Sequence, residues 1–522
     1  MYKEKYLKYK TKYLELIKHH GGECNPKPNP NDPNDPNDPD ELYGVDPIYS
    51  TNLAGLKPNQ RITFRNKCYN IETLYKLVEA KKLEDPFTRI EMNNREKEYI
   101  IKTFRRQTMS EAEITKHLDI KNSPSIITAY QYMDSSYNLV TIPESVTKIE
   151  EGAFHGGQLI TVDIPKSVTI IESYAFSNNE LISVIIPNIT IIGTGVFANN
   201  YLPLITIPAS VKIINWGAFE NNLLYSVTFS EFSNMKIIKS YAFANNRLNS
   251  IVIPKSVEII GDHAFVNNIL PNIIIPASVK IIGESAFFKN LLDSATFSEF
   301  SNIKIIKLRA FANNKLKFIN IPDSVEIIGE YAFANNLLQE IIISSSVKTI
   351  KIGTFLKNHL NAVTIPDNVT NIEADAFSEN LLKLVTLSKK LEIIDNNAFS
   401  HNQLISIIIP GTVVTIGTYA FAYNLKLESA TIKHGVKNIG YKAFYKNSIN
   451  TLIIPYTVTT IGNYAFAHNQ LKSILIPKTV MFIGKGAFAS NKLTNVTIPK
   501  YFEPHLNTIF KKKEGIIRYN LY

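Results

Sequence analysis

Apolar and polar positions repeat with a period of 22 residues over residues 136–500. In one unit, Leu181, Val184 and Ile186 have the Leu-x-x-Leu-x-Leu spacing of a short strand that buries one side. Pro187 then ends strand pairing because it has no N–H group to donate. A second short apolar pair, a turn and an inward-pointing aromatic complete the unit. The pattern therefore predicts a chain of short parallel strands separated by tight turns.

One phenylalanine marks each unit, and alanine precedes it in all units except two, where Val196 and Thr354 take its place. Three residues after the phenylalanine stands an asparagine, except in the first unit, which has Gly157. The phenylalanines are Phe154, Phe176, Phe197, Phe219, Phe243, Phe265, Phe287, Phe311, Phe333, Phe355, Phe377, Phe399, Phe421, Phe444, Phe466 and Phe488. This register predicts about sixteen stacked coils.

A single coil of this length buries too few apolar side chains to offset its backbone entropy, so coils must stack on one another to fold. We expect the asparagines to form a ladder whose amides bond backbone groups that the turns leave unpaired. Both columns are therefore interpreted as structural and not as functional sites.

The units resemble the BspA-like leucine-rich repeats. Residues 316–336 carry the motif as Leu316, Ile319, Ile321-Pro322, Ser324-Val325, Ile328-Gly329, Ala332-Phe333 and Asn336. The resemblance implies an α+β leucine-rich-repeat solenoid of about 16 coils that binds other proteins. Many members of that family are surface-exposed and have cysteine where this chain has the column asparagine, so an adhesin role is in doubt.

The strand positions that point away from the coil interior form a β-branched row with few charges. Such a row is either a docking surface or a consequence of strand propensity alone, and both interpretations stay open. The candidate partner-binding residues are Ile185, Thr206, Val252, Ile274, Asn320, Ile342, Thr364, Ile408 and Ile453, and the row continues to Thr141, Asp163, Leu475 and Thr497.

The rest of the chain divides by composition. Residues 1–20 predict a basic amphipathic helix, and 21–43 a linker rich in proline, asparagine and aspartate. Residues 44–107 return to a globular composition and predict a small α/β domain. We expect 108–135 to be a helical or irregular N-terminal cap and 501–522 to be a C-terminal cap or tail.

Residues 46–105 resemble a U-box, the zinc-free relative of the RING domain. The resemblance rests on Asp46-Pro47-Ile48, Cys68-Tyr69-Asn70 and Asp85-Pro86-Phe87-Thr88-Arg89. It implies that Ile48, Leu77 and Pro86 would face a ubiquitin-conjugating enzyme. Leu77 stands where tryptophan is frequent, and a small helical domain that only caps the solenoid remains the alternative.

The formal charge is +10 and the isoelectric point is about 9.1. We interpret the basic residues as dispersed, which favours solubility over a nucleic-acid site. Cys24 and Cys68 are the only cysteines, so neither a disulfide framework nor a cysteine-rich zinc site is expected. No catalytic motif, cofactor motif, signal peptide or transmembrane stretch is recognised, which predicts an intracellular protein. Residues 1–20 also resemble leaders of giant-virus proteins, which would place the protein in host cytoplasm or virion.

Two functions follow from these patterns. The first is a non-enzymatic scaffold whose solenoid contacts one or more proteins. The alternative is a U-box ubiquitin ligase, with catalysis by positioning, whose solenoid recruits substrates. The pattern does not determine the oligomeric state.

A longer repeat lies over the short one. The stretch that begins at Ile207 recurs 68 residues later at Ile275, including a Phe-Ser-Glu-Phe-Ser-Asn insertion at 229–234 and again at 297–302. This indicates duplication of a block of three units.

Overall fold

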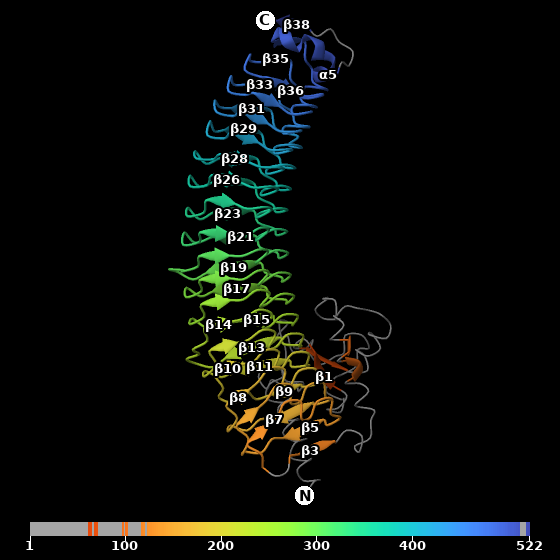
Figure 1. Cartoon of the computed structure of the whole chain (residues 1–522), viewed down its shortest axis with the longest axis vertical. Helices are drawn as coiled ribbons and strands as arrows, with labels where there is room; N and C mark the ends of the chain where they lie inside the picture. Colours follow the sequence, from red (N-terminus) through yellow and green to blue (C-terminus); the bar gives the residue numbers. More distant parts are fainter. Residues whose placement is uncertain are drawn as a thin grey trace, which may run out of the picture.

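The structure is a computed structural model. It describes residues 97, 98, 100–102, 116–120, 123–511 and 518–522 (without the side chain of residue 519), together with the backbone of 61–64 and 67–70. From residue 123 to residue 511 the chain forms one continuous stack of coils that bends along its length (Figure 1). The predicted solenoid is therefore confirmed.

The coils contribute strands of two to four residues to a first ladder and strands of two residues to a second ladder, and both ladders are parallel. The first ladder consists of β3 (His117–Asp119), β5 (Leu139–Thr141), β7 (Thr161–Asp163), β9 (Ser183–Val184), β11 (Leu204–Ile207), β13 (Ser226–Phe229), β15 (Ser250–Ile251), β17 (Asn272–Ile275), β19 (Ser294–Phe297), β21 (Phe318–Asn320), β23 (Glu340–Ile342), β25 (Ala362–Thr364), β27 (Leu384–Thr386), β29 (Ser406–Ile409), β31 (Ser429–Ile432), β33 (Thr451–Ile453), β35 (Ser473–Leu475), β37 (Asn495–Ile498) and β38 (Arg518–Leu521).

The second ladder consists of β4 (Ile126–Ile127), β6 (Lys148–Ile149), β8 (Ile170–Ile171), β10 (Ile191–Ile192), β12 (Ile213–Ile214), β14 (Ile237–Ile238), β16 (Ile259–Ile260), β18 (Ile281–Ile282), β20 (Ile305–Ile306), β22 (Ile327–Ile328), β24 (Thr349–Ile350), β26 (Asn371–Ile372), β28 (Ile393–Ile394), β30 (Thr415–Ile416), β32 (Asn438–Ile439), β34 (Thr460–Ile461) and β36 (Phe482–Ile483). Upstream, β1 (Arg61–Phe64) and β2 (Lys67–Asn70) pair antiparallel.

The third side of each coil is a turn and not a helix, and residues 123–499 contain no helix. Helical residues in the described part occur at 97, 98 and 100–102, and in η4 (Lys500–His505) and α5 (Leu506–Phe510). The α+β description therefore applies to the ends of this part of the chain, while the repeats consist of strands and turns alone.

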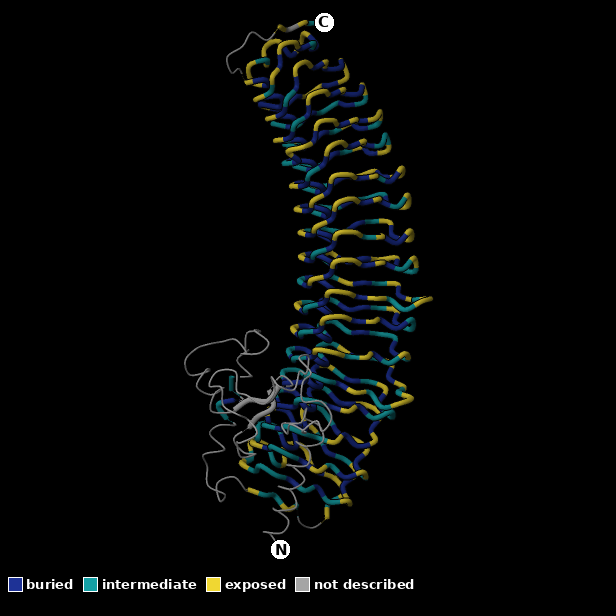
Figure 2. The backbone as a smooth tube through the Cα atoms, turned by 180° about the vertical axis from the view of Figure 1, so that it is seen from behind, coloured by how far each residue is buried: buried dark blue, intermediate teal, exposed yellow. Residues whose placement is uncertain are grey.

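A column of phenylalanine rings runs through the core. Consecutive rings stack with centroids 5.2–5.8 Å apart, as in the 5.5 Å step from Phe311 to Phe333. Isoleucine, valine, leucine and alanine surround the rings and are almost fully buried. Figure 2 shows buried and exposed stretches within each coil, repeated along the stack. Each ring therefore contacts the coils before and after it, so no coil has a core of its own.

The asparagine ladder predicted from the sequence is confirmed. The side-chain amide of Asn336 donates to the carbonyl oxygens of Phe311 at 2.9 Å and Phe333 at 3.1 Å. Its carbonyl oxygen accepts the N–H of Leu316 at 3.0 Å. Asn336 is 4 % exposed, so these bonds replace water for backbone groups that the turn would otherwise bury unpaired.

The stack extends beyond the predicted residues 136–500 at both ends. In the segment expected to be an N-terminal cap, β3 pairs with β5 and β4 pairs with β6 in the same register as later coils. Tyr132 takes the place of the phenylalanine and stacks on Phe154 at 5.2 Å. At the other end, Phe510 of α5 stacks on Phe488 at 5.7 Å, and β38 pairs with β37. The aromatic column thus runs from Tyr132 to Phe510, through about eighteen turns.

Candidate protein-binding face

The first ladder presents alternate residues of each strand to solvent. In β29, Ile407 and Ile409 are buried, whereas Ser406 and Ile408 are exposed. The same alternation follows in the other strands because successive side chains of a strand point to opposite sides. Two outward rows therefore run along the stack, one through the Ser406 position and one through the Ile408 position. We call them together the first-ladder face.

The structure places all the predicted candidate residues in the second of these rows. Val252 is 84 % exposed and Ile453 is 81 % exposed, the largest values among the aliphatic candidates. Thr141 and Thr497, near the two ends, are half-buried. The exposed candidates are Ile185, Thr206, Val252, Ile274, Asn320, Ile342, Thr364, Ile408 and Ile453.

Four members of the row were missed in the sequence. Thr228, Thr296, Thr386 and Thr431 lie in register with the predicted residues, as in the pairing of Thr206 with Thr228. The prediction used proline as its marker, and these strands are followed by serine or lysine at that position. The first buried residue of each of these strands marks the row, because the next residue along the chain belongs to the row. Using this residue as the marker instead of proline identifies all four threonines.

Charge is nearly absent from the first-ladder face. Between residues 183 and 497 its two rows hold fifteen residues each, and Glu340 is the only charged one. Because 20 % of the chain is charged, about six would be expected among thirty positions. The rows contain serine, threonine, asparagine and exposed aliphatic residues instead. A partner can therefore cover this face without removing ions from water, which would be costly.

The edge beside the second ladder has the opposite character. Glu258 accepts from Lys236 at 3.0 Å and from Lys280 at 2.8 Å, one coil to either side. These two lysines lower the pKa of Glu258 to about 2, because they favour its ionised form. This edge therefore carries charged residues on successive coils, whereas Glu340 is the one charged residue in the two rows of the first-ladder face between residues 183 and 497.

Two phenylalanines project from the lengthened coils. Phe232 and Phe300 stand at the same position of the duplicated insertion and are 90 % and 91 % exposed. Both have a left-handed backbone, with φ of 57° and 55°. The sequence revealed the insertion but gave no reason to expect its aromatic residue at the surface, because every column phenylalanine is buried.

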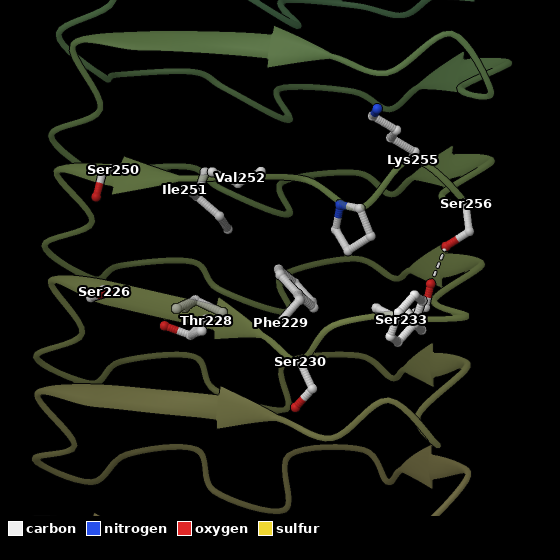
Figure 3. Close-up of a pocket in the computed structure, with 13 residues that line it drawn as sticks. Ser226, Thr228, Phe229, Ser230, Ser233, Ser250, Ile251, Val252, Lys255 and Ser256 are labelled. Atoms are coloured by element: carbon white, nitrogen blue, oxygen red, sulfur yellow. Dashed lines mark hydrogen bonds between the residues drawn. The ribbon is translucent and has the colours of Figure 1, made fainter.

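An open groove of about 790 Å³ lies beside the first of these loops. It is lined by parts of two neighbouring coils, including Thr228, Phe229, Phe232, Val252 and Lys255. Figure 3 shows Thr228 on β13, Val252 directly after β15 on the adjacent coil, and Phe229 between the two coils. The groove therefore joins the insertion loop to the first-ladder face.

Ile48, Leu77 and Pro86, predicted to contact a ubiquitin-conjugating enzyme, lie outside the described residues. The same holds for the predicted helix and linker of residues 1–43. The U-box interpretation therefore stays a prediction.

Within the described part, no group of three or more His, Cys, Asp or Glu side chains is arranged to hold a metal ion. The helices described there are too short or too polar to cross a membrane.

The sequence matches the family model described as "BspA type Leucine rich repeat region (6 copies)" over residues 125–247, 218–337, 288–406 and 392–517. These overlapping matches cover the stack from its first complete coil to the C-terminal cap. No curated protein matches the chain.

Several solved structures have a similar fold. A leucine-rich repeat protein from Bacteroides ovatus is 21% identical, with 64% of this chain and 88% of that chain covered and a TM-score of 0.36. The pneumococcal vaccine antigen PcpA is 20% identical, with coverage of 68% and 85% and a TM-score of 0.33. YopM from Yersinia enterocolitica is 15% identical, with coverage of 87% and 100% and a TM-score of 0.35.

Proposed function

The chain belongs to the BspA-type leucine-rich repeat family, and from this premise we propose that it is a non-enzymatic scaffold that binds another protein through its first-ladder face. The observation that carries the proposal is the near absence of charge from a surface fifteen coils long. Exposed aliphatic side chains such as Val252 and Ile453 lie on it. The face fits a partner protein with an uncharged, partly apolar surface. Association of two such surfaces removes apolar area from water and buries no unpaired charge.

The test is direct binding of a partner first captured with the tagged full-length chain and then purified. Val252→Lys and Ile453→Lys each place a charge on the face without touching the core. We expect whichever position the partner covers to lose at least tenfold in affinity, about 1.4 kcal/mol. Ile327→Lys, on the second ladder and 43 % exposed, is the matched control and should bind like the unmodified protein.

The proposal fails if lysine at both face positions, and at Ile342 between them, leaves the affinity unchanged. It also fails if Ile327→Lys weakens binding as much as they do. Melting curves of all four variants must coincide, so that a loss of binding is not a loss of folding.

A second candidate function rests on the residues that resemble a U-box. We propose as the alternative that residues 44–107 recruit a ubiquitin-conjugating enzyme inside the cell and that the solenoid supplies the substrate. An autoubiquitination assay with a panel of conjugating enzymes tests this. Activity that is lost in Ile48→Ala and Pro86→Ala supports a ligase, whereas inactivity across the panel, or equal activity in both variants, contradicts it.

A further inference from the structure

The net positive charge of the chain is concentrated at its C-terminal end. Residues 401–522 hold fourteen of the 56 lysines and arginines but three of the 46 aspartates and glutamates, so residues 1–400 are close to neutral. Between residues 401 and 500, Glu428 is the only acidic residue. The view of the basic residues as dispersed is therefore wrong for this end of the molecule, where an electrostatic attraction for anions is expected.

Tyrosine and lysine side chains from successive coils meet on one turn edge of this region. We call this set the tyrosine–lysine edge, and it consists of Tyr419, Tyr423, Tyr441, Lys442, Tyr445, Lys446, Tyr464, Lys485 and Lys511. Three pairs of these rings are edge-on: Tyr441 with Tyr419, Tyr441 with Tyr464, and Tyr445 with Tyr423.

Two of these tyrosines depart from the repeat. Tyr441 stands where the preceding coil has Thr418, and Tyr445 where it has Ala422. Neither ring is required by the coil, because threonine and alanine serve there one coil earlier. Tyr441 is 38 % exposed, so its ring is available at the surface. These two rings are thus additions to the repeat and not parts of its core.

The lysines of the edge are held against the rings. The ammonium nitrogen of Lys442 lies 5.0 Å from the ring centres of Tyr419 and Tyr441 and 4.9 Å from that of Tyr445. It also donates to the Tyr419 hydroxyl at 2.7 Å. Lys446 lies 5.5 Å from the ring centre of Tyr423. These contacts fix the positive charges beside aromatic faces at an exposed edge.

No described carboxylate neutralises these charges. Among the described residues, none lies within 4.0 Å of Lys442, Lys446 or Lys485. Glu428, the one acid of this region, precedes a first-ladder strand and not the turn edge. An anion from outside is therefore the complement that the edge lacks.

We propose that the tyrosine–lysine edge binds single-stranded nucleic acid. Phosphates would meet the lysines, and unpaired bases would stack on tyrosine rings, the combination by which proteins hold single strands without reading their sequence. With coils roughly 4.8 Å apart, the edge from Tyr419 to Lys511 is about 20 Å long, which suits a short stretch of nucleotides. An acidic polypeptide would pair with the lysines, but it has no flat base to stack on the exposed ring of Tyr441.

The test uses the full chain and a fluorescently labelled oligouridylate of twelve nucleotides, with anisotropy measured over a range of salt concentrations. We expect binding at low salt that weakens steeply as salt rises, because counterions are released from phosphates. The variant Tyr441→Thr/Tyr445→Ala carries the residues of the preceding coil and should fold normally. It should lose at least tenfold in affinity, because each stacked base contributes about 1–3 kcal/mol.

Lys442→Gln/Lys446→Gln should weaken binding and also flatten its salt dependence. The matched control is Lys289→Gln/Arg309→Gln, which removes two charges from the corresponding turn positions of earlier coils and should leave the affinity unchanged. A duplex of the same length should bind more weakly, because its bases are already stacked.

Three results would overturn the proposal. The first is an absence of oligouridylate binding at low salt, and the second is full binding by the tyrosine variant. The third is tighter binding of polyglutamate than of oligouridylate, which would assign the edge to an acidic protein.

Discussion

The buried amide of Asn336 bonds four backbone groups in two coils, and the ring of Phe333 beside it packs against the rings of both neighbouring coils. One side chain therefore satisfies polar backbone groups and the other fills the space between coils. Neither could be replaced by a residue of different shape without leaving an unpaired group or a void. This geometry explains why phenylalanine and asparagine recur at these two positions in successive coils.

Phe333→Ala should destabilise the coils around it by about 3–5 kcal/mol, because it leaves a cavity between Phe311 and Phe355. Hydrogen exchange and limited proteolysis of the folded protein would show increased opening near residue 333. Phe232→Ala, which removes a ring that is 90 % exposed, is the control and should leave both unchanged. Equal protection of the two variants would contradict the core assignment.

At the scale of the element, each turn relies on a left-handed residue whose size differs from coil to coil. Tyr331 and Gly353 occupy this position in neighbouring coils, with φ of 54° and 57°. The tyrosine ring lies over the glycine of the next coil, where an added Cβ would overlap it. The same arrangement joins Tyr174 to Gly195. The glycine thus serves both a backbone conformation and a contact between coils.

Gly353→Ala should therefore be destabilising for two reasons. The left-handed conformation costs an alanine roughly 1–2 kcal/mol, and the new methyl group displaces the Tyr331 ring. Chemical denaturation would measure the total. Adding Tyr331→Ser should restore the stability lost through the overlap. The stability lost through the left-handed backbone of alanine should remain lost. If the double variant were no more stable than Gly353→Ala alone, the contact would not be the cause.

The ion triad beside the second ladder gives a pH prediction. Glu258 has a pKa of about 2 in the folded chain and an ordinary value of 4.5, so it favours folding at pH values above 4.5. That contribution should disappear as the pH falls from 4.5 through 2. Glu258→Gln should thus lower the melting temperature slightly at pH 6 and not at pH 2. Added salt at pH 6 should reduce the difference, because all three groups are exposed to solvent. A difference that persists at pH 2 would rule out ionisation as its source.

The sequence predicted the elements that carry the repeat and missed those that replace a marker residue. Tyr132 and Phe510 extend the aromatic column, but the first is not phenylalanine and the second lies in a helix, so the period alone did not reveal them. Thr228 joins the first-ladder face without a following proline. The tyrosine–lysine edge could not be predicted because Lys442 and Tyr464 are adjacent only after coils stack. The U-box fold of residues 46–105 remains a prediction.

At the scale of the whole molecule, the core of each coil packs against the adjacent coils, so stability is close to a sum of local terms and the ends matter most. Phe510, in α5, covers the ring of Phe488 at the C-terminal end of the column. We expect Phe510→Ala to expose the last coils to exchange and proteolysis while the centre of the stack keeps its protection. Uniform loss of protection along the chain would show instead that the solenoid unfolds as one cooperative unit.

The 68-residue duplication has a consequence for the length of the solenoid. Because Phe229 and Phe297 hold equivalent positions in β13 and β19, excising residues 230–297 would join two chain segments at matching points of the repeat. The product would be a shorter rod of the same cross-section, with every remaining side chain facing its former direction and a single projecting aromatic loop. Length in this molecule is therefore adjustable in steps of three turns, independently of what either end recognises.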